Sequence, residues 1–295
     1  MAQPNGSAAV RVLPHAPPEL TQHRLLRLGE GIGKVVYASD HWVVKRERTP
    51  SEIVALIALW RILRRIERLL PARFGRRLVE RPSRQIRFLR VLAQATMAIL
   101  PRAVWFTANI RQVWRQYHFR SARGDRLART RLNGTSLIPE EVTFPSVRVD
   151  VGGWPGSLTV SRATERVEMT LYQKLADLAD AGRFEDLEQW LERFLSARQT
   201  GWSLGLFSLD AHLKNYGIVQ DRIVLLDSGG LTDRWADVEQ RLAAEEQLGA
   251  PHLRLGLGKF LVNRPDIAAR FDARWKALVN HTALRQMWPG DTRPR

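Results

Sequence analysis

The chain has 295 residues, of which 44% are hydrophobic and 26% are charged, and it carries a formal net charge of +16. This composition is ordinary for a globular protein, and the length suits one large domain or two lobes. The absence of cysteine excludes disulfides and thiolate chemistry.

The positive charge is concentrated in one segment. Residues 61–131 hold 19 Arg, no Lys and three acids, a net +16, so the remainder of the chain is neutral. A block of one sign repels itself unless an anionic partner neutralises it, although a solvated helical face is the alternative. The longest apolar stretch, 91–106, is interrupted by Pro101 and Arg102, so no bilayer-spanning helix is expected.

The chain begins with residues 1–20, which contain four prolines and no long apolar run. They predict a flexible tail rather than a signal peptide. Apolar residues then alternate around Gly29, Gly31 and Gly33, and again up to Lys45. This pattern predicts a glycine-rich hairpin followed by a strand that ends near the lysine.

Helical signals follow the strand. Thr49 or Ser51 can cap a helix, and Glu52 favours its positive end. The segment 71–131 reads as further basic helices with breaks at its prolines. Beyond it we expect strands at 143–151 and 157–162, helices at 169–182 and 184–201, a strand that ends at Asp227, and a mostly helical last seventy residues.

Three motifs stand in a fixed order along the chain. The glycine hairpin precedes Lys45, a D-x-H-x-x-N loop carries Asp210, His212 and Asn215, and an Asp-x-Gly begins at Asp227. Each motif alone is common, because a tight hairpin, a solvated strand end or capped turns would explain it. Their order and their expected secondary structure together are much rarer.

These motifs resemble those of the protein-kinase-like phosphotransferases. The stretches "LGEGIGKVVYA", "WVVK", "DAHLKN" and "LLDSGG" are closest to aminoglycoside and choline kinase-like enzymes and to lipopolysaccharide core-sugar kinases. The resemblance spans roughly residues 28–230. It implies an α+β, two-lobed fold with a small antiparallel sheet in an N-lobe, 21–165, a basic helical insertion, 61–131, and a mainly helical C-lobe, 166–295.

The resemblance also implies ATP and Mg²⁺ as cofactors. Backbone N–H groups of a glycine-rich loop can approach phosphate oxygens without a Cβ in the way. The family pattern assigns phosphate binding to a hairpin and a strand lysine, here Gly29, Gly31, Gly33 and Lys45. We place Glu52 opposite Lys45 as its partner, although only seven residues separate them.

The catalytic and metal-binding roles fall in the later motifs. By resemblance, Asn215 and Asp227 supply oxygen ligands to Mg²⁺, which prefers few protein oxygens together with phosphates and water. Asp210 would accept or orient the proton of the acceptor hydroxyl. His212 fits a hydrogen-bonded structural residue of the loop better than a base or a ligand.

The sequence departs from the protein-kinase pattern in several places. The glycine loop is G-x-G-x-G, one residue short, and "SLD" has no His or Arg before Asp210. Ser228 replaces the usual Phe, and no A-P-E element follows. The last two differences favour a phosphotransferase for a small molecule, sugar or lipid over a regulated protein kinase.

We therefore expect an ATP-dependent kinase that transfers the γ-phosphate to a hydroxyl of a small molecule, sugar or envelope glycolipid. The alternative is a pseudokinase or nucleotide-binding scaffold that docks on an anionic membrane or an acidic protein through residues 61–131. Nucleic acid is a less favoured partner, because no nucleic-acid-binding motif is present. The expected location is the cytoplasm, with peripheral attachment to the inner membrane face as an option.

Overall fold

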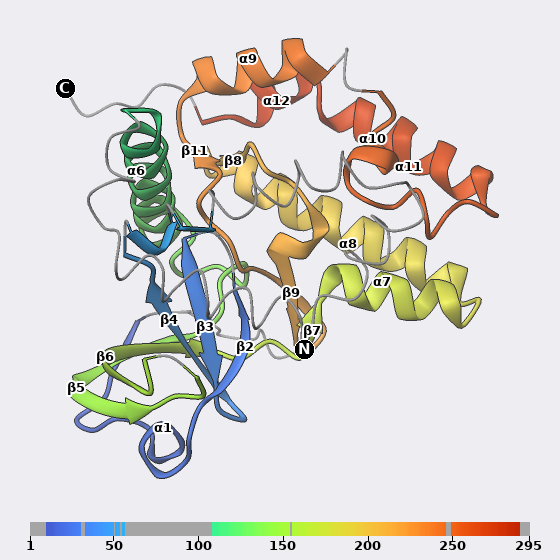
Figure 1. Cartoon of the computed structure of the whole chain (residues 1–295). Coiled ribbons are helices and arrows are strands. Elements are labelled where there is room, and N and C mark those ends of the chain that lie inside the picture. The colour runs from blue at the N-terminus through green and yellow to red at the C-terminus, as the bar shows by residue number, and fades with distance from the viewer. Residues whose placement is uncertain are drawn as a thin grey trace, which may run out of the picture.

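The computed structural model describes residues 10–30, 33–49, 51–53, 55–56, 108–153, 155–245 and 249–289. Figure 1 shows a mixed α+β architecture in which strands gather at one end and helices at the other. Gly31 and most of the basic segment, 61–107, lie outside the described residues. Within the described ranges, no helix combines the length and the apolar character needed to cross a membrane.

A six-stranded sheet forms one end of the molecule, in the order β1-β5-β6-β4-β3-β2. All neighbouring strands are antiparallel except β1 and β5, which run parallel. The expected glycine-rich hairpin is β2 and β3, and the expected pair of strands beyond residue 140 is β5 and β6. The strands are β1 Arg11–Val12, β2 Leu26–Glu30, β3 Lys34–Ala38, β4 Trp42–Glu47, β5 Glu141–Asp150 and β6 Ser157–Glu165.

The sequence predicted a flexible tail over residues 1–20, but the structure shows ordered elements from residue 11 onward. Arg11 and Val12 pair with β5, and helix α1, Pro18–Gln22, follows directly. Leu20 of this helix is fully buried in the core of the sheet, together with Leu25, Tyr37 and Val142. Two short elements leave too little periodicity for a sequence pattern to detect, and burial of one leucine fixes them.

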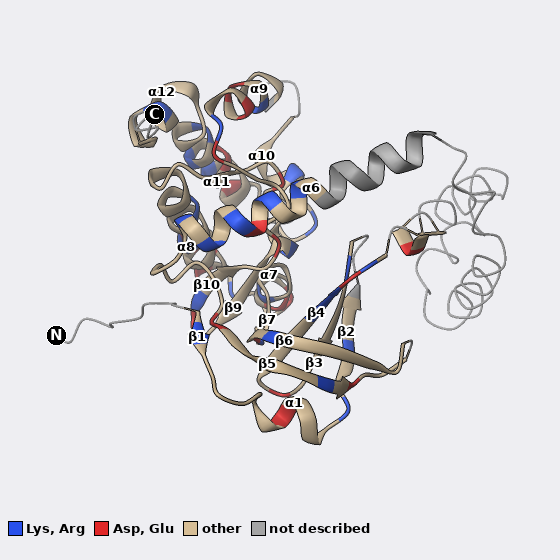
Figure 2. Ribbon diagram, turned by 90° about the vertical axis from the view of Figure 1, so that its left-hand side faces the viewer, with Lys and Arg blue, Asp and Glu red and all other residues tan. Residues whose placement is uncertain are grey.

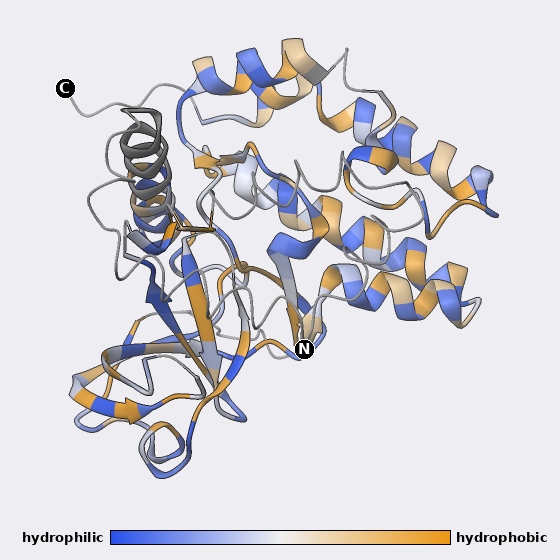
Figure 3. Cartoon of the chain, viewed as in Figure 1, coloured by the Kyte–Doolittle hydropathy of each residue, from blue (hydrophilic) through white to orange (hydrophobic). Residues whose placement is uncertain are grey.

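Helices and short strands form the other end of the molecule. The helices expected at 169–182 and 184–201 are α7, Leu171–Asp180, and α8, Phe184–Ser203. A separate core of apolar residues between Leu171 and Trp288 lies beneath them, and Figure 3 shows apolar and polar positions alternating along these helices. The remaining helices are α9 Trp235–Glu245, α10 Pro251–Arg254, α11 Pro265–Leu278 and α12 His281–Met287.

Short strands in the helical part flank the loops that contain Asp210 and Asp227. Strand β7, Met169–Thr170, and the hairpin of β9, Tyr216–Val219, and β10, Arg222–Leu225, form one small sheet. Strands β8, Phe207–Ser208, and β11, Leu231–Thr232, form another. Strand β10 ends two residues before Asp227, so that aspartate lies in a loop rather than at a strand end.

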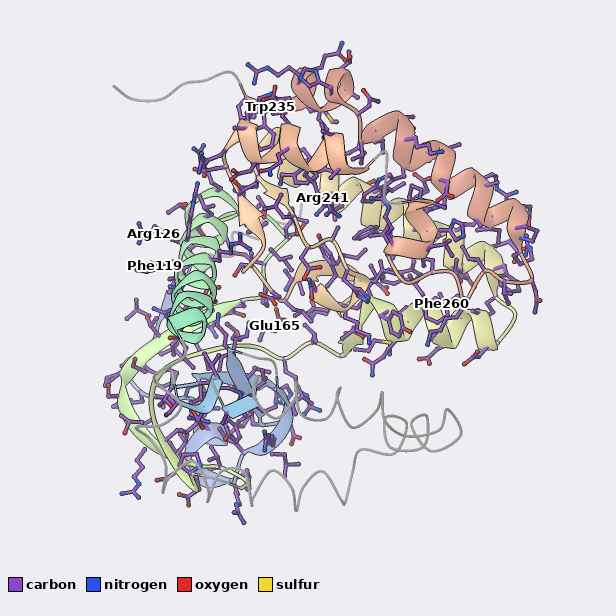
Figure 4. All side chains as sticks on the ribbon, turned by 45° about the horizontal axis from the view of Figure 1, so that its top comes forward. Phe119, Arg126, Glu165, Trp235, Arg241 and Phe260 are labelled. Carbon is purple, nitrogen blue, oxygen red and sulfur yellow. The ribbon has the colours of Figure 1, made fainter. Side chains whose placement is uncertain are left out.

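Helix α6, Ala108–Arg131, stands between the two parts and carries basic residues along its described length (Figure 2). Its last turns are integrated into the fold, because Leu127, Ala128 and Leu132 form a buried cluster with Leu206. A second link is the ion pair between Arg222 in β10 and Glu165 in β6, at the junction seen in Figure 4. The end of the basic segment is therefore a structural element between the sheet and the helices.

Candidate functional site

Lys45 of β4 lies against the loop that carries Asp227. Its Nζ donates a hydrogen bond of 3.1 Å to the carbonyl oxygen of Leu226, the residue just before that aspartate. The charge of Asp227 also acts on the lysine amine. Two residues separated by 182 positions in the sequence thus meet at one place, where a strand of the sheet faces a loop of the helical part.

The hairpin of β9 and β10 explains why Asn215 joins them. Asn215 immediately precedes β9, and Leu226 immediately follows β10, so both lie at the same end of the hairpin. The Leu226 N–H donates to the Asn215 carbonyl at 2.8 Å. Antiparallel pairing therefore brings Asn215, the predicted amide ligand, next to the residue that precedes Asp227, the predicted carboxylate ligand.

The second small sheet brings Asp210 to the same point. Strand β8 leads into the Asp210 loop, and β11 begins directly after Gly230, so both loops leave the same end of this pair. The Leu209 N–H donates to the Gly230 carbonyl at 2.8 Å. A Cβ on Gly230 would lie 3.1 Å from the Cβ of Asp210, which shows how closely the two loops pack.

The orientation of Asn215 suits a cation ligand. Its side-chain Nδ2 donates to the Asp210 carbonyl at 3.1 Å, which leaves its Oδ1 available. Asp227 accepts the Gly229 N–H at Oδ1, at 2.9 Å. No group of three or more His, Asp and Glu gathers as a metal site among the described residues. A Mg²⁺ ion held mainly by phosphates needs only these two oxygens.

Gly29 and Gly33 leave open space over the hairpin. Gly29 pairs with Val36 next to a register shift, and Gly33 precedes β3. A Cβ added at either position would meet no atom within 4 Å. Protein packing therefore does not require glycine at these two positions, and a phosphate approaching the backbone would use the free space.

The structure adds a carboxylate that sequence reasoning missed. Asp125 on α6 forms an ion pair of 2.8 Å with Lys34 of β3 and accepts a hydrogen bond from the Ser228 hydroxyl. Gly124, beside it, packs against the loop, because a Cβ there would lie 2.7 Å from the Ser228 carbonyl carbon. In the sequence, Asp125 is marked only by the preceding glycine, within a segment of 19 arginines. Its contact with Lys34 depends on tertiary packing that the sequence pattern does not reveal.

Charges of both signs surround Lys45, and the pKa of its amine lies below the ordinary value. Desolvation and the neighbouring Lys34 lower the pKa of Lys45, while the carboxylates of Asp125 and Asp227 oppose this. The residue as a whole is exposed, while its amine lies among protein groups and donates to the Leu226 carbonyl. Desolvation also acts on Asp125, yet the hydrogen bond and charge of Lys34 hold the pKa of Asp125 below its ordinary value.

Glu52 does not pair with Lys45, and this expectation was wrong. Both of its carboxylate oxygens bind the guanidinium of Arg46, at 2.7 and 3.0 Å. Successive side chains of a strand point to opposite faces, so a helix that meets Arg46 cannot also meet Lys45. The Thr49 hydroxyl accepts the Glu52 N–H at 3.4 Å, and the Glu52 carboxylate accepts the Thr49 N–H at 2.9 Å, which confirms Thr49 as a helix cap.

Two further residues hold the Asp210 loop. His212 has the structural role that the sequence suggested, since its Nδ1 accepts the Lys214 N–H at 3.2 Å. The buried guanidinium of Arg198 donates to the Tyr216 hydroxyl at 3.0 Å and to the Ser208 carbonyl at 3.4 Å. Aromatic rings of Trp202, Phe207 and Trp275 surround that cation. The buried guanidinium of Arg198, stabilised by these aromatic rings, therefore holds both ends of the Asp210 loop.

Comparisons with protein-family models and with curated proteins found no match for this chain.

Proposed function

We propose that the chain is a protein-kinase-like phosphotransferase that uses ATP and Mg²⁺. One observation carries the proposal: Lys45, Asp210, Asn215 and Asp227, from three separate stretches, lie around one point. An ammonium, two oxygen ligands and a further carboxylate are the groups that phosphoryl transfer requires. The arrangement of a sheet end and a helical end on either side of this point supports a two-lobed, kinase-like fold.

Each residue has a distinct task in the proposed reaction. Lys45 binds phosphate oxygens of ATP as a point charge, and backbone N–H groups of the glycine hairpin approach the same oxygens. Asn215 and Asp227 would hold Mg²⁺, which neutralises charge on the triphosphate. Asp125 takes the supporting place that the sequence had given to Glu52, because its charge acts on Lys45.

Asp210 acts on the acceptor. Its carboxylate takes the proton of the acceptor hydroxyl as the hydroxyl oxygen bonds to the γ-phosphorus. The bond between that phosphorus and the β–γ bridging oxygen breaks, ADP leaves with the electron pair, and Asp210 returns the proton to solvent. The acceptor class is a small molecule, sugar or envelope glycolipid.

Asp210→Asn tests the catalytic assignment. Since the carbonyl oxygen, not the carboxylate, of Asp210 holds Asn215, the variant should fold and bind Mg-ATP normally. ADP formation across a panel of sugars, amino alcohols and glycolipids should fall by about 10²- to 10⁴-fold. Turnover that persists in the variant would overturn the assignment.

A nucleotide-binding scaffold is the alternative, and the outer face of α6 favours it. Phe119 is 68% exposed, and Arg120 and Arg126 beside it are exposed as well. Figure 4 shows Phe119 and Arg126 on the side of α6 away from the helical part. Such a face suits an anionic surface. Nucleotide binding by the wild type without turnover on any acceptor would support the scaffold and its docking role.

A further inference from the structure

Three segments of the helical part meet beside the Asp210 loop at Tyr172. The tyrosine lies at the start of α7, and Lys214 belongs to the 3₁₀ turn η1, Leu213–Asn215. Lys259 comes from the connection between α10 and α11. The Nζ atoms of Lys214 and Lys259 lie 4.9 and 4.8 Å from the centre of the tyrosine ring. We call these three residues the lysine–tyrosine cluster.

The cluster adjoins the proposed catalytic aspartate. Lys214 stands between Asp210 and Asn215 in the same loop. The ring of His212 lies 6.2 Å from that of Tyr172, and the His212 N–H donates to the Asp210 carboxylate at 3.4 Å. One residue therefore connects Asp210 to the edge of the cluster.

The base of the cluster is rigid. Phe260 is 9% exposed and packs on Tyr172, with ring centres 5.0 Å apart; Figure 4 labels it in the helical part. Gly256 has a φ of +87°, and a Cβ there would lie 3.5 Å from the His212 ring and 3.6 Å from Tyr172. The connection after α10 thus follows these rings closely, while the two lysines stay exposed.

The charge of the cluster is uncompensated. Among the described residues, neither Lys214 nor Lys259 forms an ion pair, whereas Lys34 pairs with Asp125. The tyrosine ring attracts both ammonium groups but does not cancel their charge, and they repel each other. A pair of unneutralised cations beside a catalytic carboxylate favours a ligand with an anionic group.

We propose that the lysine–tyrosine cluster is an acceptor subsite for a compound that already bears a phosphate or carboxylate. This inference rests on the proposed phosphoryl transfer. Lys214 and Lys259 bind the anionic group, and its position sets the hydroxyl at Asp210. The acceptor is then a sugar phosphate, a sugar acid or an anionic glycolipid, and a neutral or cationic sugar binds poorly.

The test compares Lys214→Met/Lys259→Met with the wild type and with Lys174→Met. Lys174 on α7 is a matched control, because its Nζ also lies near an aromatic ring, 5.6 Å from the centre of Trp190. The probes are glucose 6-phosphate, glucuronate and glucose, titrated without nucleotide and followed by calorimetry. Circular dichroism and melting temperature establish that each variant is folded.

We expect the wild type and Lys174→Met to bind both anionic probes, and the double variant to bind them at least about tenfold more weakly. Equal affinity in all three proteins would overturn the proposal. So would a wild type that binds Mg-ATP but neither anionic probe. Anion binding that depends on the two lysines, in a chain that binds no Mg-ATP, would instead refute the phosphoryl-transfer function.

A vesicle arm identifies the source of the anionic group. Flotation with vesicles of one part phosphatidylglycerol to three parts phosphatidylcholine is compared for the same three proteins. Selective loss in the double variant would identify a lipid headgroup at the cluster. Unchanged flotation together with weaker binding of glucose 6-phosphate would identify a dissolved acceptor.

Discussion

Two pairs of lysines lie near Asp210, and their surroundings differ. Lys34 and Lys45 face two carboxylates, those of Asp125 and Asp227. Lys214 and Lys259 face aromatic rings instead: both lie over Tyr172, and Lys259 also lies over Phe260. Carboxylates offset much of the charge of the first pair, so under the proposed function its amines are held in place before a nucleotide arrives. No acid offsets the second pair in the same way, so under the proposed subsite it favours an anionic ligand.

The difference follows from which element faces each pair. Helix α6 supplies Asp125 to the first pair, although most of the charged side chains of its described part are arginines. The segments around Tyr172 supply aromatic rings and no acid within hydrogen-bonding distance of either lysine among the described residues. Disturbing α6 should therefore affect the proposed nucleotide site around Lys45 and leave the lysine–tyrosine cluster intact.

Gly124→Ala should have the largest effect. The new Cβ would overlap the Ser228 carbonyl oxygen, and neither backbone can yield without moving α6 or the Asp227 loop. Overpacking of this kind costs about 1–3 kcal/mol of unfolding free energy, more than the gain of about 1 kcal/mol from helix propensity. Urea denaturation and Mg-ATP titration would measure the loss of stability and of nucleotide affinity.

Gly201→Ala is the matched control, since Gly201 also lies in a helix and its Cβ would make only an ordinary contact, 3.7 Å from the Leu206 carbonyl. This variant should be as stable as the wild type or more stable. If Gly124→Ala also keeps full stability and nucleotide affinity, α6 does not support the site.

Asp125→Asn should have a smaller, pH-dependent effect. The pKa of Asp125 is lowered in the folded chain, so its contribution is present above the pKa of an unfolded aspartate and disappears as the pH falls through the folded value. We expect a loss of about 1–2 kcal/mol at neutral pH that shrinks in acid. Denaturation at several pH values measures it.

The same variant should change the basic limb of the activity profile. Removing the Asp125 charge lowers the pKa of Lys45 further, so activity should be lost at a lower pH than in the wild type. Glu52→Gln is the control. It breaks an ion pair with Arg46, which lies beside Lys45 on β4, and it should leave the basic limb of the activity profile unchanged. If the basic limb of the activity profile does not move in Asp125→Asn, the charge of Asp125 on α6 does not act on Lys45.

Sequence patterns predicted the parts of the site that depend on local order. The hairpin, the strand of Lys45, the Asp210 loop and helices α7 and α8 follow from alternation, turn residues and helical periodicity. The D-x-H-x-x-N spacing also reflects local geometry, because His212 and Asn215 bond within their own loop.

Partners chosen by tertiary packing could not be predicted. Glu52 was close to Lys45 in sequence, but strand pleating gives it Arg46 instead. Asp125 was hidden in a basic segment, and its role depends on Gly124 meeting a loop more than a hundred residues later. Strand β10 stops at Leu225 rather than at Asp227, and the backbone of Leu226 bonds to Lys45 and to Asn215, which the sequence did not predict.

The most direct test of the central claim is a calorimetric titration of a non-hydrolysable ATP analogue, with and without Mg²⁺, into the wild type, Lys45→Met and Lys174→Met. We expect Mg²⁺-dependent binding by the wild type and Lys174→Met, and at least about tenfold weaker binding by Lys45→Met. Equal affinity of all three proteins for the analogue, or no binding by the wild type, would show that Lys45 does not bind a metal-bridged triphosphate.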